Sequence, residues 1–256
     1  MELLSPREVA MFALTLLDLT NLREDCDAAA IETLCRRAQS PHGATAAICI
    51  WPRFVAQARG ILGEGHPVRI ATVVNFPSGE LPVSTVVEET RQAIADGADE
   101  IDLVIPYRAF LAGNEAAVTE MVTAVRAACP SACLKVILET GEIKESGKIR
   151  RASELAIEAG ADFIKTSTGK VSVNATLEAA DIMLQAIRDS RKKVGFKPAG
   201  GISTVADADL YLRLAETIMG ANWLMPSTFR FGASGLLDDI LATIAGTAGP
   251  RASTGY

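Results

Sequence analysis

Several features are scarce in this chain, and each scarcity excludes a class of protein. Histidine occurs only twice, and the five cysteines lack zinc-type spacing, so we expect no metal site. No apolar run approaches the ~20 residues of a membrane-spanning helix. Met1–Ala10 has charged residues and a proline where a secretory signal has basic, apolar and small regions. The sequence therefore predicts a cytoplasmic protein with reduced cysteines and no membrane partner.

Positive charge is also in short supply. The 256 residues include 25 Lys and Arg against 31 Asp and Glu, which gives a formal net charge of −6. Nucleic-acid-binding proteins normally carry a basic face or stripe, so we expect no nucleic-acid partner. Any phosphate that the protein recognises must be held by a few local groups. With 49% hydrophobic residues, the chain has enough apolar side chains for a sizeable core.

Short apolar runs alternate with segments of helical periodicity along the chain. The eight expected strands are Met11–Leu17, Ala46–Trp51, Arg69–Phe76, Glu100–Pro106, Leu134–Glu139, Phe163–Thr168, Lys193–Lys197 and, less clearly, Trp223–Phe231. The clearest helices are Val83–Ala95, Ala116–Ala128, Lys148–Ala159, Leu177–Arg188 and Leu236–Ile244. Such alternation predicts parallel strands in units of about 30 residues. We therefore expect one (β/α)8 TIM-barrel domain over residues 1–256, with a short N-terminal helical cap and a flexible tail over 246–256.

A short pattern recurs at three expected helix ends. Gly-Ala-Asp begins at Gly97 and Gly160, and Gly-Ala-Asn begins at Gly220, at intervals of 63 and 60 residues. Glycine suits the left-handed backbone that ends a helix, and the next apolar residue is expected to start a strand. Each interval spans about two βα units, which favours the barrel. An open doubly wound sheet would have the same kind of loop and remains the alternative.

Three of the expected strands carry a charged side chain on the inward face. Side chains alternate between the two faces of a strand, and the apolar face of a barrel strand meets the helices. By this rule Asp102, Lys165 and Lys197 point into the barrel. The two lysines also lie near the carboxyl ends of neighbouring strands, where barrel enzymes build their active sites. An interior charge is costly unless it is paired, so we expect these groups to interact.

Two neighbouring lysines inside a barrel have a chemical use. Only an unprotonated amine attacks a carbonyl, and burial beside a second cation lowers the pKa of an amine. The pair predicts Schiff-base chemistry, with Asp102 available to move a proton. A Lys–Asp–Lys ion network that merely stabilises the barrel remains the alternative, because structural networks perturb ionisation too.

Glycine-rich segments follow three consecutive expected strands. Glycine lets backbone N–H groups approach an anion, and the start of a helix adds the positive end of its dipole. The loops after strands seven and eight are the usual phosphate position of this fold. The sequence therefore predicts a phosphate site at this end of the barrel. Its candidate residues are Gly169, Lys170, Gly200, Gly201, Gly232 and Ser234.

Eight segments of the chain carry a resemblance to an enzyme family. They are Asp18–Thr20, Ala47–Phe54, Val73–Pro77, Pro106–Arg108, Glu139–Glu142, Lys165–Lys170, Gly195–Gly201 and Arg230–Ser234. These segments closely resemble the 2-deoxy-D-ribose-5-phosphate aldolase family, nearly from end to end. The resemblance implies a class I aldolase that needs no metal or other cofactor. It also implies reversible cleavage of 2-deoxy-D-ribose 5-phosphate to D-glyceraldehyde 3-phosphate and acetaldehyde, so the expected partners are small sugar phosphates and aldehydes.

The resemblance further implies roles for single residues. Lys165 corresponds to the Schiff-base lysine, Lys197 to the second lysine that lowers its pKa, and Asp102 to the acid/base. Tyr256 corresponds to a terminal tyrosine that moves a proton at the donor carbon, with a disordered end as the alternative. Other members of the substrate site that the resemblance implies, besides the glycine-rich segments, are Asp18, Thr20, Cys49 and Thr168.

Two positions depart from the family pattern. Ser203 stands where bacterial relatives carry an arginine, and Gly235 stands where they carry a second serine. Both changes remove a phosphate ligand, so we expect backbone groups to dominate the phosphate site. A transaldolase-like Schiff-base enzyme and a non-catalytic sugar-phosphate-binding barrel remain alternative functions, since fold alone does not decide function. The sequence leaves the oligomeric state open, a homodimer included.

Overall fold

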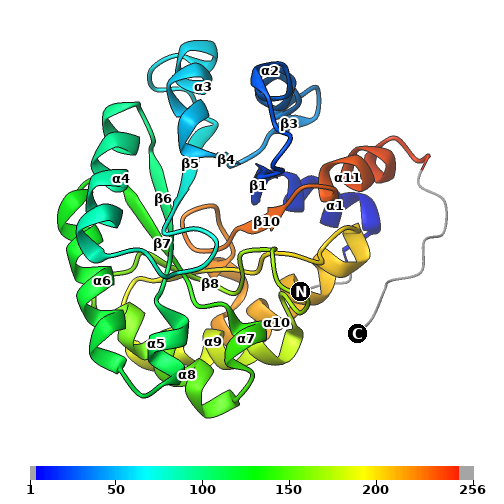
Figure 1. Cartoon of the computed structure of the whole chain (residues 1–256). Helices are drawn as coiled ribbons and strands as arrows, with labels where there is room; N and C mark the ends of the chain where they lie inside the picture. The colour runs from blue at the N-terminus through cyan, green and yellow to red at the C-terminus, as the bar shows by residue number, and fades with distance from the viewer. Residues whose placement is uncertain (1–3, 248–256) are drawn as a thin grey trace.

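Eight parallel strands form a ring at the centre of the molecule (Figure 1). The structure is a computed structural model and describes residues 4–247. The strand order is β10-β1-β4-β5-β6-β7-β8-β9, and isolated bridges from Phe196 to Phe229 and from Ala199 to Gly232 join its two ends. The predicted (β/α)8 barrel is therefore confirmed. Its strands are β1 (Leu17–Asn21), β4 (Ala47–Ile50), β5 (Arg69–Val74), β6 (Glu100–Val104), β7 (Cys133–Ile137), β8 (Phe163–Lys165), β9 (Gly195–Lys197) and β10 (Phe231–Ala233).

Helices surround the ring and connect successive strands (Figure 1). The main core lies between strands and helices, because outward-facing residues such as Ile101, Leu103 and Ile164 are fully buried there. The helices are α1 (Pro6–Thr15), α2 (Ala28–Arg37), α3 (Val55–Leu62), α4 (Val83–Ala95), α5 (Tyr107–Leu111), α6 (Glu115–Ala128), α7 (Thr140–Ile143), α8 (Ser146–Glu158), α9 (Leu177–Ser190), α10 (Val205–Met219) and α11 (Leu236–Ile244). Short elements are the 3-10 helices η1 (Pro52–Phe54) and η2 (Ala221–Trp223) and the hairpin of β2 (Gln39–Ser40) and β3 (Gly43–Ala44).

The predicted helices agree closely with the structure. Helices α4 and α11 have the predicted bounds, and α6, α8 and α9 differ by at most two residues at either end. The expected N-terminal cap is α1, which packs against α10 and α11. Within residues 4–247, no helix is both long and apolar enough to cross a membrane.

The prediction of a strand over Met11–Leu17 was wrong. Residues up to Thr15 belong to α1, and the first barrel strand begins at Leu17. Ser5 and Glu8 start the helix with a reciprocal capping box, which satisfies N–H groups at the helix start. The buried residues of α1 are Val9, Ala10, Ala13 and Leu14, which is helical spacing rather than alternation. The capping box of Ser5 and Glu8 therefore indicates this helix better than the apolar run Met11–Leu17 indicates a strand.

The eighth strand also differs from its prediction. Residues around Trp223 form the 3-10 helix η2, so the third copy of the glycine pattern, at Gly220, does not lead into a strand. A turn follows, in which the N–H groups of Thr228 and Phe229 donate to the carbonyl of Met225. Strand β10 begins only at Phe231 and has three residues. The turn uses the backbone groups that a longer strand would need.

The first copy of the glycine pattern forms an ion pair at the amino-terminal rim of the barrel. Gly97 ends α4 with a φ of 101°, as predicted. Asp99 follows, and its Oδ2 accepts hydrogen bonds from Arg59 Nη2 at 2.7 Å and from the N–H of Ile70 at 2.8 Å. A Cβ at position 97 would lie 2.9 Å from Arg59 Cγ, so a side chain there would displace the arginine. Asp99, directly before β6, thus connects this strand to α3 and β5.

The second copy repeats this arrangement. Gly160 ends α8 with a φ of 106°, and Asp162 Oδ2 accepts from Arg126 Nη1 at 2.6 Å and from the N–H of Leu134 at 2.8 Å. Both aspartates come directly before a barrel strand, β6 in one case and β8 in the other. We call Arg59–Asp99 and Arg126–Asp162 the rim pairs.

Candidate active site

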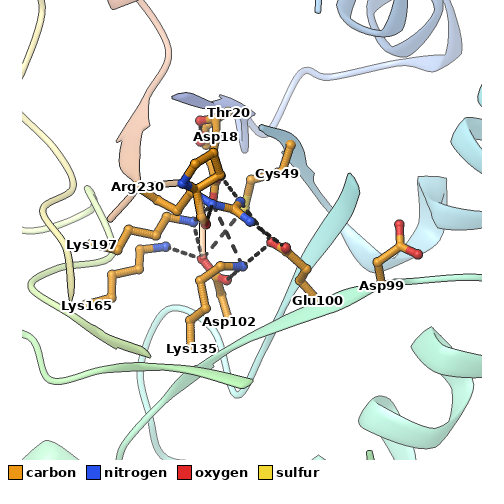
Figure 2. Close-up of polar contacts among 12 residues, drawn as sticks. Asp18, Thr20, Cys49, Asp99, Glu100, Asp102, Lys135, Lys165, Lys197 and Arg230 are labelled. Atoms are coloured by element: carbon orange, nitrogen blue, oxygen red, sulfur yellow. Dashed lines mark hydrogen bonds and ion pairs between the residues drawn. The ribbon is translucent and has the colours of Figure 1, made fainter. Parts of the chain in front are cut away.

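Charged side chains fill one side of the barrel interior (Figure 2). They come from β1, β6, β7, β8 and β9 and from the residue before β10, and each is less than a tenth exposed. We call them the interior cluster. Its seven members are Asp18, Glu100, Asp102, Lys135, Lys165, Lys197 and Arg230.

Asp102 lies at the centre of this cluster. Its Oδ2 accepts hydrogen bonds from Lys165 Nζ at 2.7 Å and from Lys197 Nζ at 2.8 Å, and its Oδ1 accepts from Lys135 Nζ at 3.0 Å. Burial alone would raise the pKa of Asp102, but the three ammonium groups outweigh burial and hold the pKa well below its usual value. Asp102 is therefore a carboxylate in the resting protein.

The two lysines predicted to be neighbours are register partners. Lys165 of β8 pairs with Lys197 of β9, and both side chains point inward, as the alternation rule predicted. Lys197 Nζ also donates to Asp18 Oδ2 at 2.5 Å. Burial disfavours the charged form of Lys197, yet the carboxylates of Asp102 and Asp18 outweigh burial and raise its pKa. Lys197 is thus a permanent cation beside Lys165.

A second group of charges lies next to these residues. Lys135 Nζ donates to Glu100 Oε2 at 2.5 Å, and Arg230 Nη2 donates to Glu100 Oε1 at 2.9 Å. Arg230 Nη1 also donates to Asp18 Oδ1 at 2.6 Å. Burial opposes the charges of Lys135 and Arg230, but the surrounding carboxylates raise the pKa of both groups. These side chains anchor Asp18 and Glu100 and support the groups around Asp102.

The interior cluster is not electrically balanced. It holds four cations and three carboxylates, so it carries one surplus positive charge if all seven groups are ionised. Each of three cations contacts at least two carboxylates, whereas Lys165 contacts Asp102 alone and shares it with two other lysines. Lys165 is therefore the cation of the cluster with the fewest carboxylate contacts.

A pocket of about 780 Å³ opens above Lys165. It is formed by the segments that follow β1, β8, β9 and β10, at the carboxyl ends of these strands. Of the seven members of the interior cluster, Lys165 alone lines it. The other predicted site residues in its wall are Thr20, Thr168, Gly169, Lys170, Gly200, Gly201, Gly232 and Ser234.

Five predicted site residues are not in the wall of this pocket, and two of them are Asp102 and Lys197, the cluster members described above. Asp18 belongs to the interior cluster, where it contacts Lys197 and Arg230. Cys49 is buried with its Sγ 4.0 Å from Asp102 Oδ2, and burial raises the pKa of its thiol, so it is a neutral neighbour of the cluster. Tyr256 lies outside the described residues, as do residues 248–255 of the predicted tail.

The glycine-rich segments leave little room for side chains beside the pocket. A Cβ at Gly200 would lie 2.7 Å from Asn174 Cβ, and one at Gly232 would lie 2.8 Å from Ala199 Cβ. Gly169, Gly200 and Gly201 all have φ values between 81° and 84°, which favours glycine. In residues 4–247, no acceptor takes a hydrogen bond from the N–H groups of Gly169, Gly201 or Gly235. These donors can bind an anion in the pocket.

The β8 segment is held in place by a carboxylate that the sequence analysis did not assign to the site. Glu139 follows β7 with a left-handed φ of 62° and is fully buried. Its Oε2 accepts from Thr168 Oγ1 at 2.6 Å, and its Oε1 accepts from the Thr168 N–H at 3.2 Å. Lys170 Nζ then reaches the carbonyl of Leu22 across the pocket at 2.8 Å. Both contacts shape the wall near Lys165.

The sequence analysis missed three members of the interior cluster. Glu100 lies two residues before Asp102 on the same strand, so the alternation rule places both on one face. Lys135 interrupts the apolar run of β7 in the same way as Lys165 and Lys197 interrupt theirs. Arg230 lies inside the expected strand Trp223–Phe231, between the apolar Phe229 and Phe231, so the alternation rule would have selected it as well. The part of the chain that the structure describes has no cluster of three or more candidate metal ligands.

Comparison with known proteins decides the family. The pattern of the DeoC/LacD family of aldolases matches residues 12–239. The chain belongs to this family. A deoxyribose-phosphate aldolase of Agrobacterium fabrum is 72% identical over 257 residues, which cover 100% of this chain and 99% of that protein. The resemblance seen in the sequence is therefore confirmed, and this DeoC/LacD aldolase is an enzyme, not the non-catalytic barrel that remained an alternative.

Solved structures agree with the fold of this DeoC/LacD aldolase. A candidate deoxyribose-phosphate aldolase of Coccidioides immitis has a TM-score of 0.81 and 30% identity, covering 92% of this chain and 86% of that one. One of Toxoplasma gondii has a TM-score of 0.86 and 25% identity, covering 94% and 97%. As an aldolase, the enzyme makes or breaks a carbon–carbon bond in small-molecule substrates.

Proposed function

We propose that this aldolase reversibly cleaves 2-deoxy-D-ribose 5-phosphate to D-glyceraldehyde 3-phosphate and acetaldehyde through a Schiff base on Lys165. One observation carries the proposal: Lys165 belongs to the interior cluster and also lines a pocket walled by anion-binding loops. The name of the relative from Agrobacterium fabrum supports the same substrate. The whole chain, residues 1–256, is then one catalytic domain.

The contacts of the interior cluster support Lys165 as the nucleophile. Lys197, Lys135 and Arg230 remain charged because each contacts two or more carboxylates. Lys165 contacts Asp102 alone and is the one of these four cations that lines the pocket, so it is the amine that a substrate carbonyl can reach. In its unprotonated form, Lys165 Nζ attacks the C1 aldehyde carbon of the substrate. Loss of water from the adduct, with one proton taken up from solvent, leaves a protonated imine, and the final hydrolysis returns that proton.

The protonated imine then accepts the electrons of the breaking bond. The C3 hydroxyl loses its proton, the C2–C3 bond breaks, and its electron pair moves toward the imine nitrogen to give an enamine. D-glyceraldehyde 3-phosphate leaves at this point. Asp102, a carboxylate 2.7 Å from Lys165 Nζ, accepts the hydroxyl proton through a water. The lysines that depress its pKa make Asp102 a transient acceptor that passes the proton on.

The last steps return the enzyme to its starting state. Protonation of the enamine at C2 restores the imine, and water releases acetaldehyde and neutral Lys165. Tyr256 is our proposed proton donor at C2.

The N–H groups of Gly169, Gly201 and Gly235, with the start of α11, are the proposed phosphate ligands. The homodimer and the cytoplasmic location stay predictions.

Trapping the intermediate tests this proposal. The enzyme is incubated with acetaldehyde, reduced with borohydride and digested, and the added ethyl group is located by mass spectrometry. We expect it on Lys165, with Lys165→Met unmodified there and inactive. Lys170→Met is the matched control, because Lys170 also lines the pocket but lies outside the interior cluster. A modified Lys197, or turnover by Lys165→Met, would overturn the proposal. A lysine-bound three-carbon fragment from a ketose phosphate would favour the transaldolase-like alternative.

A further inference from the structure

The wall of the pocket contains an arginine that neither the sequence analysis nor the proposed mechanism uses. Arg37 is the last residue of α2, and its side chain lines the pocket together with Gly201, Ser203 and Gly235. Helix α2 lies beside α11 at the top of the barrel (Figure 1). Arg37 reaches the pocket from the end of α2, whereas Lys170 belongs to the segment that follows β8. It is therefore a second source of positive charge for the same space.

A carboxylate of α11 holds this arginine. Arg37 Nη2 donates to Asp238 Oδ1, and Asp238 lies in the first turn of α11, next to the segment that contains Gly235. The Arg37 side chain is 38% exposed and that of Asp238 is 70% exposed, so water reaches both partners. A carboxylate at this place would repel a phosphate in the pocket. Among the described residues, Asp238 is therefore the negative partner of Arg37 in the free enzyme, and a phosphate in the pocket would be a stronger partner.

The other pocket arginine differs in this respect. Arg23 forms a two-bond fork with Asp25, two residues along the chain, with both distances at 2.8 Å. Both side chains are mostly exposed. The fork uses the Nε/Nη2 edge of the guanidinium, one of the N–H edges through which an arginine binds a phosphate in a bidentate manner. Arg37 contacts Asp238 through a single nitrogen, so within residues 4–247 its other N–H groups have no partner and can bind another anion.

We propose that Arg37 binds the phosphate of the sugar substrate, with Asp238 as its counterion in the free enzyme. The inference rests on the proposed function and adds a side-chain ligand where Ser203 and Gly235 supply none. A guanidinium binds phosphate through two parallel hydrogen bonds, and a dianionic phosphate is a stronger partner than an exposed carboxylate. Among the described residues its partner is Asp238, which lies outside the interior cluster, so Arg37 acts on substrate binding rather than on the chemistry at C1.

The matched pair of neighbouring arginines tests this proposal. Arg37→Gln and Arg36→Gln remove the same charge from the same helix turn, but Arg36 is outside the pocket wall and donates to Thr33 Oγ1. The measurement is kcat/KM for 2-deoxyribose 5-phosphate divided by kcat/KM for unphosphorylated 2-deoxyribose. We expect this ratio to fall about tenfold in Arg37→Gln, mainly through KM, and less than twofold in Arg36→Gln.

Removing the counterion gives the opposite result. We expect Asp238→Asn to raise the same ratio by about threefold, and to do so only while Arg37 is present. In the double variant with Arg37→Gln, the gain should be lost. An unchanged ratio in Arg37→Gln, or equal losses in Arg37→Gln and Arg36→Gln, would overturn the proposal.

A binding experiment separates this inference from the proposed reaction. Titration calorimetry with inorganic phosphate needs no turnover. We expect about fivefold weaker binding to Arg37→Gln than to the wild type and to Arg36→Gln. If the wild type does not cleave 2-deoxyribose 5-phosphate but shows this difference, the reaction is wrong and the phosphate ligand stands. If all three proteins bind phosphate equally, Arg37 is not a ligand, whatever the substrate.

Discussion

The rim pairs and the interior cluster use the same residue types in different proportions. At the amino-terminal rim, Asp99 and Asp162 each have their own arginine and a backbone N–H. Figure 2 shows Asp99 pointing away from the interior, while its neighbour Glu100 points into it. Inside the barrel, four cations share three carboxylates. A rim pair only holds elements together, whereas the interior cluster leaves Lys165 with a single carboxylate partner beside the pocket.

The largest expected effect follows from removing the surplus cation. Lys165→Met should lower kcat/KM on the order of 10⁴-fold, because no other described lysine lines the pocket beside Asp102. Its stability should not fall, since the remaining three cations balance three carboxylates. Activity assays and urea unfolding check both parts. A loss of more than about 2 kcal/mol in unfolding free energy would contradict the charge count.

The next largest effect is expected at Lys197, which donates hydrogen bonds to two buried carboxylates. Lys197→Met leaves Asp18 and Asp102 short of a partner. We expect a loss of about 3 kcal/mol in stability, because two buried charge-assisted hydrogen bonds are lost, although Asp18 keeps Arg230 and Asp102 keeps Lys135 and Lys165. Activity should fall by roughly 10²-fold as the field around Lys165 changes. If Lys197→Met proved as stable as the wild type, the difference that we draw between the two lysines would be wrong.

Two adjacent residues allow a direct test of rim against interior. Glu100→Gln weakens the contacts to Lys135 and Arg230, and Asp99→Asn weakens those to Arg59 and the N–H of Ile70. We expect Glu100→Gln to lower kcat about tenfold and Asp99→Asn to leave kcat within twofold while costing about 1 kcal/mol of stability. Steady-state kinetics and thermal unfolding of both variants measure these effects. Equal losses of kcat would show that the interior cluster supports catalysis no more than a rim pair does.

The smallest expected effect is the response of stability to mild changes in pH. The lowered pKa values of Asp18 and Asp102 give stability that is present above the ordinary value of 3.8 and is lost as pH falls below it. The raised pKa values of Lys135 and Lys197 give stability that is present below 10.5 and is lost as pH rises further. Buried Glu139 acts in the opposite sense, because its raised pKa disfavours the folded state as it ionises.

The unfolding free energy should therefore change by less than about 1 kcal/mol between pH 6 and pH 9 and fall below pH 4. Urea titrations across this range measure it. A steep slope near neutral pH would mean that one of the paired interior groups already titrates there.

Much of the barrel could be predicted from the sequence because its signals are local. Helix α4 and the end of α8 follow from spacing and from the glycines that come after them, and α9 follows from spacing alone. The inward direction of Lys165 and Lys197 follows from alternation alone. The first strand was misplaced, since an apolar run of seven residues fits a helix as well as a strand. The last strand was misplaced because a three-residue strand has almost no periodicity.

The site required contacts between distant parts of the chain. The alternation rule selected the two lysines and Asp102, and it would also have selected Glu100, Lys135 and Arg230 had it been applied to every expected strand. No local signal connects Arg230 to Asp18, 212 residues away, or Arg37 to Asp238, 201 residues away. Their pairing depends on how the ends of the barrel meet.

The amino-acid sequence by itself determined the strand rhythm, the aldolase family and which lysines face inward, because each of these depends on spacing along the chain. Only the tertiary structure decided the charge balance around Lys165 and the position of Arg37 in the pocket wall. Electrostatic energy depends on distances through space, and closing the ring brings β10 against β1 and α2 beside α11. The same buried charges in another register would leave a different group uncompensated.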